Sequence, residues 1–151
     1  MKDFSLFTAV RQNFLRRVHL SEKELDLICD LIEVRKVKRK KALLIEGNIS
    51  DSVIYVNKGM LRMYTNDKKD YEEQTFDFGF EDHWFADLEG FRSKQKSKVN
   101  IEAIEDSELF LLHFNDVVRL HNLIPNMERF SRYHAEEKYI EAINRLQKIN
   151  H

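Results

Sequence analysis

The sequence has little of what marks secreted, membrane-bound or disordered proteins. Its 151 residues include one cysteine, one proline and four glycines. The single Cys29 excludes an intramolecular disulfide, and no apolar N-terminal stretch resembles a signal peptide, so we expect a reducing, cytoplasmic location. The longest apolar runs, such as residues 53–56, span four residues, whereas a membrane-spanning helix needs about 20. We therefore expect a soluble protein that does not engage a membrane.

Neither sign of charge is in excess. The 25 basic residues oppose 26 acidic ones, which gives a formal net charge of −1. The chain as a whole therefore has no electrostatic attraction for nucleic acid. The segment 35–41 holds six basic residues in seven, which offers a possible phosphate contact. We interpret it instead as the solvated face of a hairpin, since charge runs mainly solubilise.

Clustered metal ligands are also lacking. The six histidines, at positions 19, 83, 113, 121, 134 and 151, are scattered without a His-x-His pair. Metal enzymes and iron–sulfur sensors need several ligands close together, so we expect no metal, no cofactor and no catalytic residue. Cys29 is interpreted as a small core residue. An enzyme is the weakest alternative, and His83 and Asp87 would be the first residues to test for it.

What the chain does contain is enough apolar surface to fold. Eleven phenylalanines, five tyrosines and a 42% apolar fraction argue against disorder. At this length a single domain is expected, and it buries about 68–70% of the surface of its unfolded chain.

Helical periodicity is confined to the two ends of the sequence. Apolar residues recur every three or four positions from Phe4 to Val18, which predicts an amphipathic helix. Ser21 and Glu24 have the spacing of a capping box and predict a second helix over 22–32. After Leu112, Asn115 is expected to cap a short helix through Leu120. A long helix is predicted from Pro125, which suits a first helical turn, to the end of the chain.

The middle of the sequence predicts strands. Short apolar runs between polar turns predict them near 34–37, 42–46, 53–57, 60–65, 73–80, 99–104 and 108–113. Two turns are expected to set the register, at 57–59 with its glycine and at 66–70. Phe76, Phe78 and Phe80 alternate, so we expect all three rings to face the core.

This order of elements resembles the regulatory domain of Crp/Fnr-type transcriptional regulators. The resemblance rests on the segments 41–47 and 53–64 and on Trp84-Phe85-Ala86-Asp87-Leu88-Glu89-Gly90-Phe91 followed by 97–105. It covers essentially the whole chain. It implies a mainly β fold with flanking helices: a double-stranded β-helix (jelly-roll) barrel over 1–124, then a dimerisation helix over 125–151. A winged helix-turn-helix is expected to follow this helix but lies outside the chain.

The resemblance also implies a ligand site in residues 84–98, here named the cassette segment. Trp84, Ala86, Asp87, Leu88, Ser97 and Lys98 are its expected ligand-binding residues. Relatives that bind cyclic nucleotides have glycine, glutamate and arginine where this chain has Ala86, Asp87 and Ser97. The remaining candidate cations are Arg92, Lys96 and Lys98. A lysine lacks the bidentate fork of an arginine, and the loop 91–96 is one long solvated run, so we expect weak or no binding of cyclic AMP.

Several of these residues also have plain structural interpretations. Trp84 suits packing at a barrel turn better than stacking on a ligand, and Asp87 equally suits the cap of a short helix. The expected dimerisation residues are Phe130, Tyr139, Ile143 and Leu146, because a helix of about 25 residues extends roughly 37 Å, beyond one side of a small barrel.

The sequence thus predicts the sensor and dimerisation domain of a Crp/Fnr-like regulator, a homodimer that reaches DNA only through a domain outside this chain. Its effector is a small molecule that the sequence does not identify. The alternative is a stand-alone module that binds a ligand or a protein and never touches DNA. A further stretch of about 40 residues with a helix-turn-helix pattern would decide for the regulator.

Overall fold

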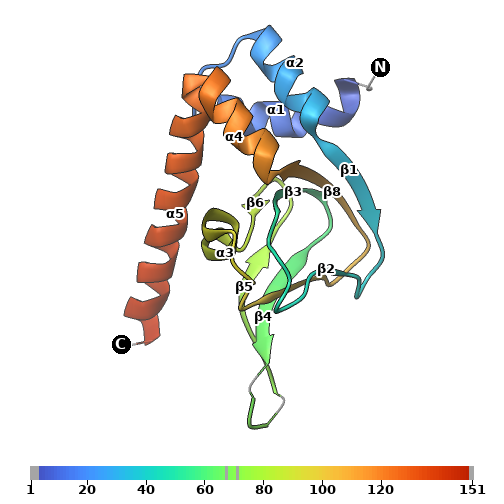
Figure 1. Ribbon diagram of the computed structural model, residues 1–151, viewed down its shortest axis with the longest axis vertical. Coiled ribbons are helices and arrows are strands. Elements are labelled where there is room, and N and C mark those ends of the chain that lie inside the picture. The colour runs from blue at the N-terminus through green and yellow to red at the C-terminus, as the bar shows by residue number, and fades with distance from the viewer. Residues whose placement is uncertain (1–3, 67, 71, 150–151) are drawn as a thin grey trace.

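The chain forms a β barrel with helices packed at one end and along one side (Figure 1). The structure is a computed structural model and describes residues 4–66, 68–70 and 72–149. A short 3-10 turn, Phe4–Phe7, leads into the helices α1 (Thr8–Leu15) and α2 (Glu22–Leu31). The barrel is interrupted by α3 (Leu88–Ser93) and is followed by α4 (Phe114–Leu123) and α5 (Pro125–Ile149).

Within the described residues, eight strands form two four-stranded antiparallel sheets, which confirms the predicted fold class. One sheet, in the order β1-β8-β3-β6, contains β1 (Glu33–Val37), β8 (Ser107–His113), β3 (Ser52–Lys58) and β6 (Trp84–Phe85). The other, in the order β2-β7-β4-β5, contains β2 (Ala42–Leu44), β7 (Asn100–Ala103), β4 (Leu61–Asn66) and β5 (Glu73–Gly79). All seven predicted strands are present. The two-residue β6 was not predicted, because it is too short to show a periodicity.

Local sequence explains most of the element boundaries. The Ser21 side chain accepts a hydrogen bond from the Glu24 backbone N–H and the Glu24 carboxylate accepts one from the Ser21 N–H, so the predicted capping box is confirmed. Gly59 turns the chain between β3 and β4 at φ +101°, where a side chain would be strained. The second predicted turn, 66–70, includes residue 67, which lies outside the described residues.

One predicted cap is wrong. The short helix begins at Phe114, with His113 in extended conformation before it, and it has no side-chain cap. Asn115 therefore lies inside the first turn. Strand β8 runs directly into the helix, so His113, its last residue, takes the capping position. Asn115 therefore has no unpaired backbone N–H after it to cap.

Two core clusters organise the molecule. The first lies between the helices and the sheet that contains β3, β6 and β8, and includes Phe14, Tyr55 and Phe110. Cys29 is buried in it, as predicted. The second fills the barrel between the two sheets with aliphatic side chains and Phe85. The barrel interior is therefore packed with the protein's own side chains.

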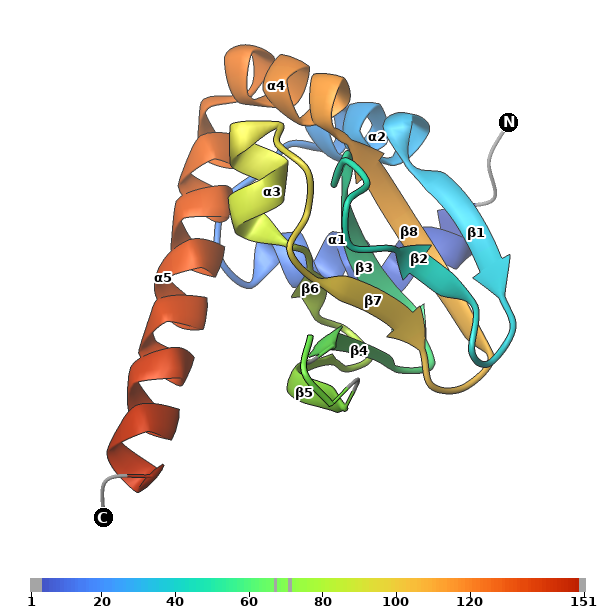
Figure 2. The ribbon, with the colours of Figure 1, turned by 60° about the horizontal axis from the view of Figure 1, so that its bottom comes forward.

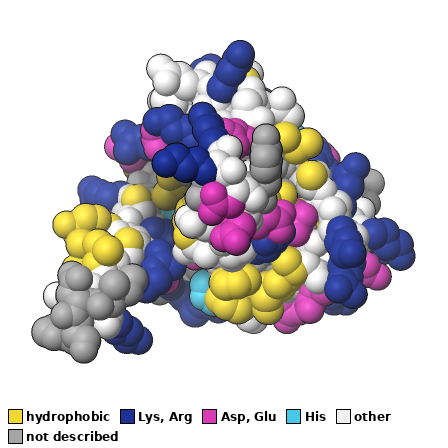
Figure 3. Space-filling view, turned by 90° about the horizontal axis from the view of Figure 1, so that it is seen from below, with side chains coloured by type: hydrophobic (Ala, Val, Ile, Leu, Met, Phe, Trp, Pro, Cys, Tyr) yellow, Lys and Arg dark blue, Asp and Glu magenta, His cyan; other side chains and the backbone are white. Residues whose placement is uncertain are grey.

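The prediction for the rings of β5 is wrong. Phe76, Phe78 and Phe80 are between 42% and 50% exposed, and Figure 3 shows hydrophobic side chains gathered beside a histidine on this face. The alternation is present, but the inward position at Gly79 is filled by Phe85, whose ring would lie 2.9 Å from an added Cβ. We name Phe76, Phe78 and Phe80 the β5 aromatic strip.

The basic segment 35–41 is largely solvated, as interpreted from the sequence. Arg35 is paired with Glu33 and Lys38 with Asp106, in exposed ion pairs. Among the described residues, no helix is long and apolar enough to cross a bilayer.

Candidate ligand-binding site

The cassette segment leaves the barrel at β6 and returns to it at β7. Figure 2 shows α3, which it contains, between the barrel and α5. The Asp87 side chain caps α3 by accepting a hydrogen bond from the Gly90 N–H at 3.2 Å. Lys94 ends the helix in left-handed conformation at φ 56°. An isolated antiparallel bridge between Ile49 and Lys96 then fixes the end of the loop.

The structure joins two of the predicted site residues directly. The Ser97 hydroxyl lies 2.6 Å from Asp87 Oδ2, and both residues are buried. The same hydroxyl accepts a hydrogen bond from the Val99 N–H at 3.1 Å. Gly90 makes room for this arrangement, because an added Cβ there would come within 2.4 Å of Asp87 Oδ2. We name Asp87, Gly90 and Ser97 the cassette clasp.

The clasp places a carboxylate at the N-terminus of α3. The N-terminus of a helix favours an anion, through its free N–H groups and its dipole. At α3 that position is taken by Asp87, and its second oxygen is engaged by Ser97. A cyclic phosphate at this point would meet a negative charge, and no arginine contact with the clasp is seen among the residues that the structure describes.

The three cations that the sequence offered in place of an arginine lie elsewhere. Lys98 forms an exposed ion pair with Glu89 at 3.2 Å, and Lys96 is exposed at the bridge to Ile49. Arg92 lines a cavity between α3 and α5. None of the three is placed by an observed contact at Ser97, within the residues that the structure describes.

Trp84 is a packing residue in this structure. It is buried, its indole N–H donates to Asn13 Oδ1 at 3.1 Å, and its ring packs against Phe14 and Tyr55. One side of it nevertheless borders the cavity, together with Ala86 and Leu88. The structure therefore brings three predicted ligand residues to one cavity and two, Asp87 and Ser97, to the clasp.

Asp82 lies just before β6 and forms a network of hydrogen bonds and an ion pair. The Asp82 carboxylate accepts hydrogen bonds from the Tyr55 hydroxyl at 2.6 Å and from Asn13 at 3.1 Å, and it pairs with Arg16 at 2.6 Å. Burial on its own raises the pKa of Asp82, but these donors outweigh it and the pKa lies below its usual value. The network fastens α1 to the segment that precedes β6.

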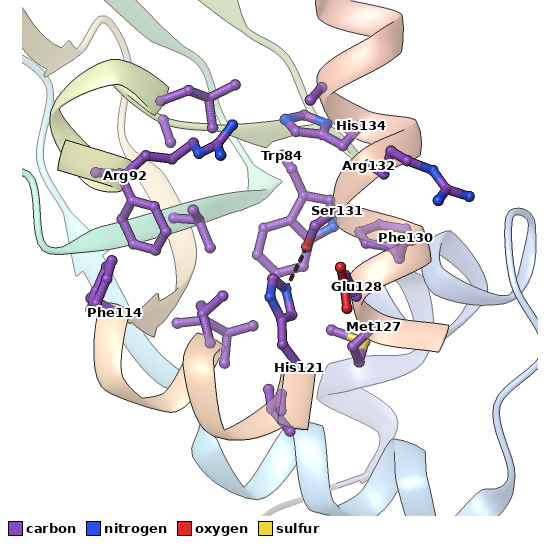
Figure 4. A pocket seen from close by; sticks show the side chains of 18 of the residues that line it. Trp84, Arg92, Phe114, His121, Met127, Glu128, Phe130, Ser131, Arg132 and His134 are labelled. Atoms are coloured by element: carbon purple, nitrogen blue, oxygen red, sulfur yellow. Dashed lines mark hydrogen bonds between the residues drawn. The ribbon is translucent and has the colours of Figure 1, made fainter. Parts of the chain in front are cut away.

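The cavity lies on the helix side of the sheet, outside the filled barrel. It has a volume of about 790 Å³ and is bounded by α3, α4 and the first turns of α5. Figure 4 shows Trp84 behind it, with His121, Ser131 and His134 around it. Sequence reasoning missed these three polar residues, because they come from two helices and share no motif. The turn-by-turn spacing of Glu128, Ser131 and Ala135 along one helix face was the only available signal.

The predicted dimerisation residues divide into exposed and buried ones. Phe130 is 6% exposed and packs against Phe14 and Trp84 of its own chain, so its ring is not offered to a partner. Ile143 is half-buried. Tyr139 and Leu146 are 67% and 56% exposed. Ile140, which was not predicted, is also exposed.

The described residues do not assemble the ligand set that a metal ion requires. Within the ranges 4–66, 68–70 and 72–149, no group of three His, Cys, Asp or Glu side chains is arranged to hold a metal ion.

Comparison with known proteins relates this arrangement to a family. The cyclic nucleotide-binding domain family matches residues 34–122. No curated protein sequence matches the chain. The catabolite activator protein of Thermus thermophilus is similar in structure, with a TM-score of 0.73 and 19% identity. The match covers 96% of this chain and 62% of the length of that protein.

Two further solved structures are similar over most of both chains. A cyclic nucleotide-binding domain from Methylobacillus flagellatus has a TM-score of 0.80 at 13% identity and covers 95% of this chain and 83% of its own. The sensor domain of the transcriptional regulator DNR from Pseudomonas aeruginosa has a TM-score of 0.71 at 16% identity and covers 91% and 94%. At these identities the structures establish a common fold.

Proposed function

Because the chain belongs to the cyclic nucleotide-binding domain family, we propose that it is the sensor and dimerisation part of a Crp/Fnr-like transcriptional regulator. In this proposal a small effector changes the position of α5, and a pair of α5 helices transmits the change to a DNA-binding domain. The family and the similar regulators point to a regulatory protein rather than an enzyme. The division into a barrel over 1–124 and a dimerisation helix over 125–151 is part of the same proposal.

The apolar surface left uncovered along α5 carries this proposal. Tyr139, Ile140 and Leu146 are each more than half exposed on the second half of the helix. The β5 aromatic strip is exposed as well, on the strand whose Asp77 contacts α5. Large exposed apolar patches mark interaction sites in soluble proteins. A second copy of the chain is the occupant that suits a helix extending beyond its own barrel.

The effector in this proposal is not a cyclic nucleotide held in the usual way. The cassette clasp supports this, because Asp87 occupies the anion position at the start of α3 and Ser97 satisfies its second oxygen. Opening the clasp for a phosphate would leave a buried carboxylate next to a second anion, without an arginine to offset either.

Sedimentation equilibrium at micromolar concentration tests the dimer. We expect a species of twice the 18.2 kDa chain mass. Ile140→Glu should shift it to the monomer, because a charge in an apolar interface is desolvated without a partner. Lys148→Gln, an exposed change on the same helix, is the matched control and should leave the dimer intact. A wild-type monomer would contradict the proposal.

A further inference from the structure

The cavity between α3, α4 and α5 has the size and lining of a small-molecule site. Its volume of about 790 Å³ lies in the range of ligand pockets, which is about 300–1,000 Å³. Trp84, Phe91 and Phe130 supply a largely aromatic wall, and Val53 and Leu112 of the sheet add aliphatic surface. An apolar body of one or two rings, or a medium alkyl chain, matches this surface.

Its inner polar groups are neutral. His121 Nε2 lies 2.8 Å from the Ser131 hydroxyl, so one hydrogen bond joins α4 to α5 across the cavity (Figure 4). Burial lowers the pKa of His121, and burial together with nearby Lys138 lowers the pKa of His134 to about 4. At neutral pH both imidazoles are therefore uncharged hydrogen-bonding groups, and the interior offers no charge to a ligand.

The charged groups at the rim make one side of the cavity more favourable for an anion than the other. Glu89 is paired with Lys98 and Arg132 with Glu136. Arg92 of α3, in contrast, lines the cavity without an ion pair or hydrogen bond in the described part of the chain. Figure 4 places Arg92 and Glu128 on opposite sides of the cavity. An anionic head is attracted to the Arg92 side and repelled from the Glu128 side.

We propose that this cavity binds an amphipathic organic acid, with its apolar body against Trp84 and Phe130 and its acid group on Arg92. This inference rests on the proposed sensor function, for which it names the effector class and the site. Because the walls come from α3, α4 and α5, an occupant would set the spacing between the cassette segment and the start of the long helix. The signal then reaches α5 without using the cassette clasp.

Fluorescence of 8-anilinonaphthalene-1-sulfonate provides the direct test, since this probe joins an aromatic body to one anionic group. We expect enhanced emission with the 151-residue chain. Decanoate and indole-3-acetate should displace the probe, and their relative strength as competitors distinguishes a preference for alkyl acids from one for aromatic acids. Decanol, which has the same chain as decanoate without the charge, should compete at least tenfold less well, because it cannot form a charge-assisted bond with Arg92.

Matched variants locate the binding. Arg92→Gln should weaken binding of the probe about tenfold, the loss expected for one charge-assisted hydrogen bond. Arg129→Gln is the matched control, because Arg129 is exposed and outside the cavity, and it should leave the affinity unchanged. Ala135→Trp places a ring into the cavity mouth from an exposed helix position and should abolish binding. Phe78→Ser should leave it unchanged, which separates the cavity from the β5 aromatic strip.

Three results would overturn the inference. These are binding that survives both Arg92→Gln and Ala135→Trp, binding that is lost with Phe78→Ser, and equal competition by decanol and decanoate. Circular dichroism of each variant shows whether a loss of binding reflects unfolding.

The dimer measured by sedimentation tests the proposed function separately. A dimer that binds no acid ends this inference alone, and a monomer that binds the acid ends the regulator proposal alone. If wild type binds no acid and Ala135→Trp loses the dimer, a second copy of the chain occupies the cavity in place of an acid.

Discussion

At Ser97 one hydroxyl closes the cassette clasp. The side chain lies 2.6 Å from Asp87 Oδ2 in a buried setting. Ser97→Ala removes that partner, so we expect the free energy of unfolding to fall by about 1.5–3 kcal/mol, the range for a bond to a charged group. Urea unfolding measures the loss. Ser93→Ala, exposed at the end of α3, is the control and should cost less than about 0.5 kcal/mol. Equal effects would show that the clasp does not hold the segment.

Asp82 gives the fold a predictable response to acid. Its pKa is lowered in the folded chain, despite burial, by donors that include Tyr55 and Arg16. A carboxyl with a lowered folded-state pKa stabilises the fold fully above its unfolded value and loses that contribution as the pH falls through the folded value. We therefore expect wild type to lose more stability than Asp82→Asn between about pH 5 and pH 3. Asparagine tolerates the left-handed backbone at this position.

Chemical denaturation at several pH values checks this response. The two stability curves should converge as the pH falls, because protonation removes from wild type what the substitution has already removed. Glu33, whose pKa is also lowered, is unchanged in both proteins and contributes equally. Parallel curves across this range would contradict the assignment of the acid response to Asp82.

Strand β5 is an edge strand whose outer face carries rings instead of charges. It ends the order β2-β7-β4-β5, and edges of this kind are usually protected against unwanted pairing. Phe78→Ser should therefore change the melting temperature of the protomer by at most a few degrees, since its ring is already 42% exposed. The same change should weaken the dimer if the β5 aromatic strip meets a partner. Thermal unfolding and sedimentation of this variant separate the two effects.

A marked loss of protomer stability in Phe78→Ser would mean that the ring contributes to the core after all. Leu61→Ala provides the comparison, because Leu61 is fully buried in the barrel. Its loss should cost about 2–5 kcal/mol.

The elements that the sequence predicted are those that local signals determine. Ser21 and Glu24 cap α2 whatever lies around them, and Pro125 starts α5 at its own position. The outward face of β5 could not be predicted, because it depends on Phe85 filling the space at Gly79. Likewise the family resemblance placed Asp87 and Ser97 in one segment, but only the folded chain shows that they bond to each other. The cavity was missed because its walls come from three separate helices.

For the molecule as a whole, the first turns of α5 are held in the core by Phe130, whereas its second half is tied to the rest of the chain by charges. Arg17 of the segment after α1 pairs with Glu137 at 2.7 Å. Asp77 of β5 faces both Lys138, at 3.8 Å, and Arg145, at 3.5 Å. Partly exposed pairs of this kind contribute little to stability individually. The second half of a helix held this way can change its position relative to the barrel at a small free-energy cost, as a relay between sensor and partner requires.

The response of the whole domain to cyclic nucleotides follows from the cassette clasp. With cyclic AMP or cyclic GMP in large excess we expect no change in the melting temperature of wild type. The triple variant Ala86→Gly, Asp87→Glu, Ser97→Arg restores the glycine, the ribose acceptor and the forked cation of nucleotide-binding relatives. If it folds, ligand at 100 times its Kd should stabilise it by about 2.7 kcal/mol, which corresponds to a rise in melting temperature of about 5–11 °C. Cyclic AMP raising the melting temperature of wild type by that amount would mean that another cation reaches the phosphate and that the clasp opens.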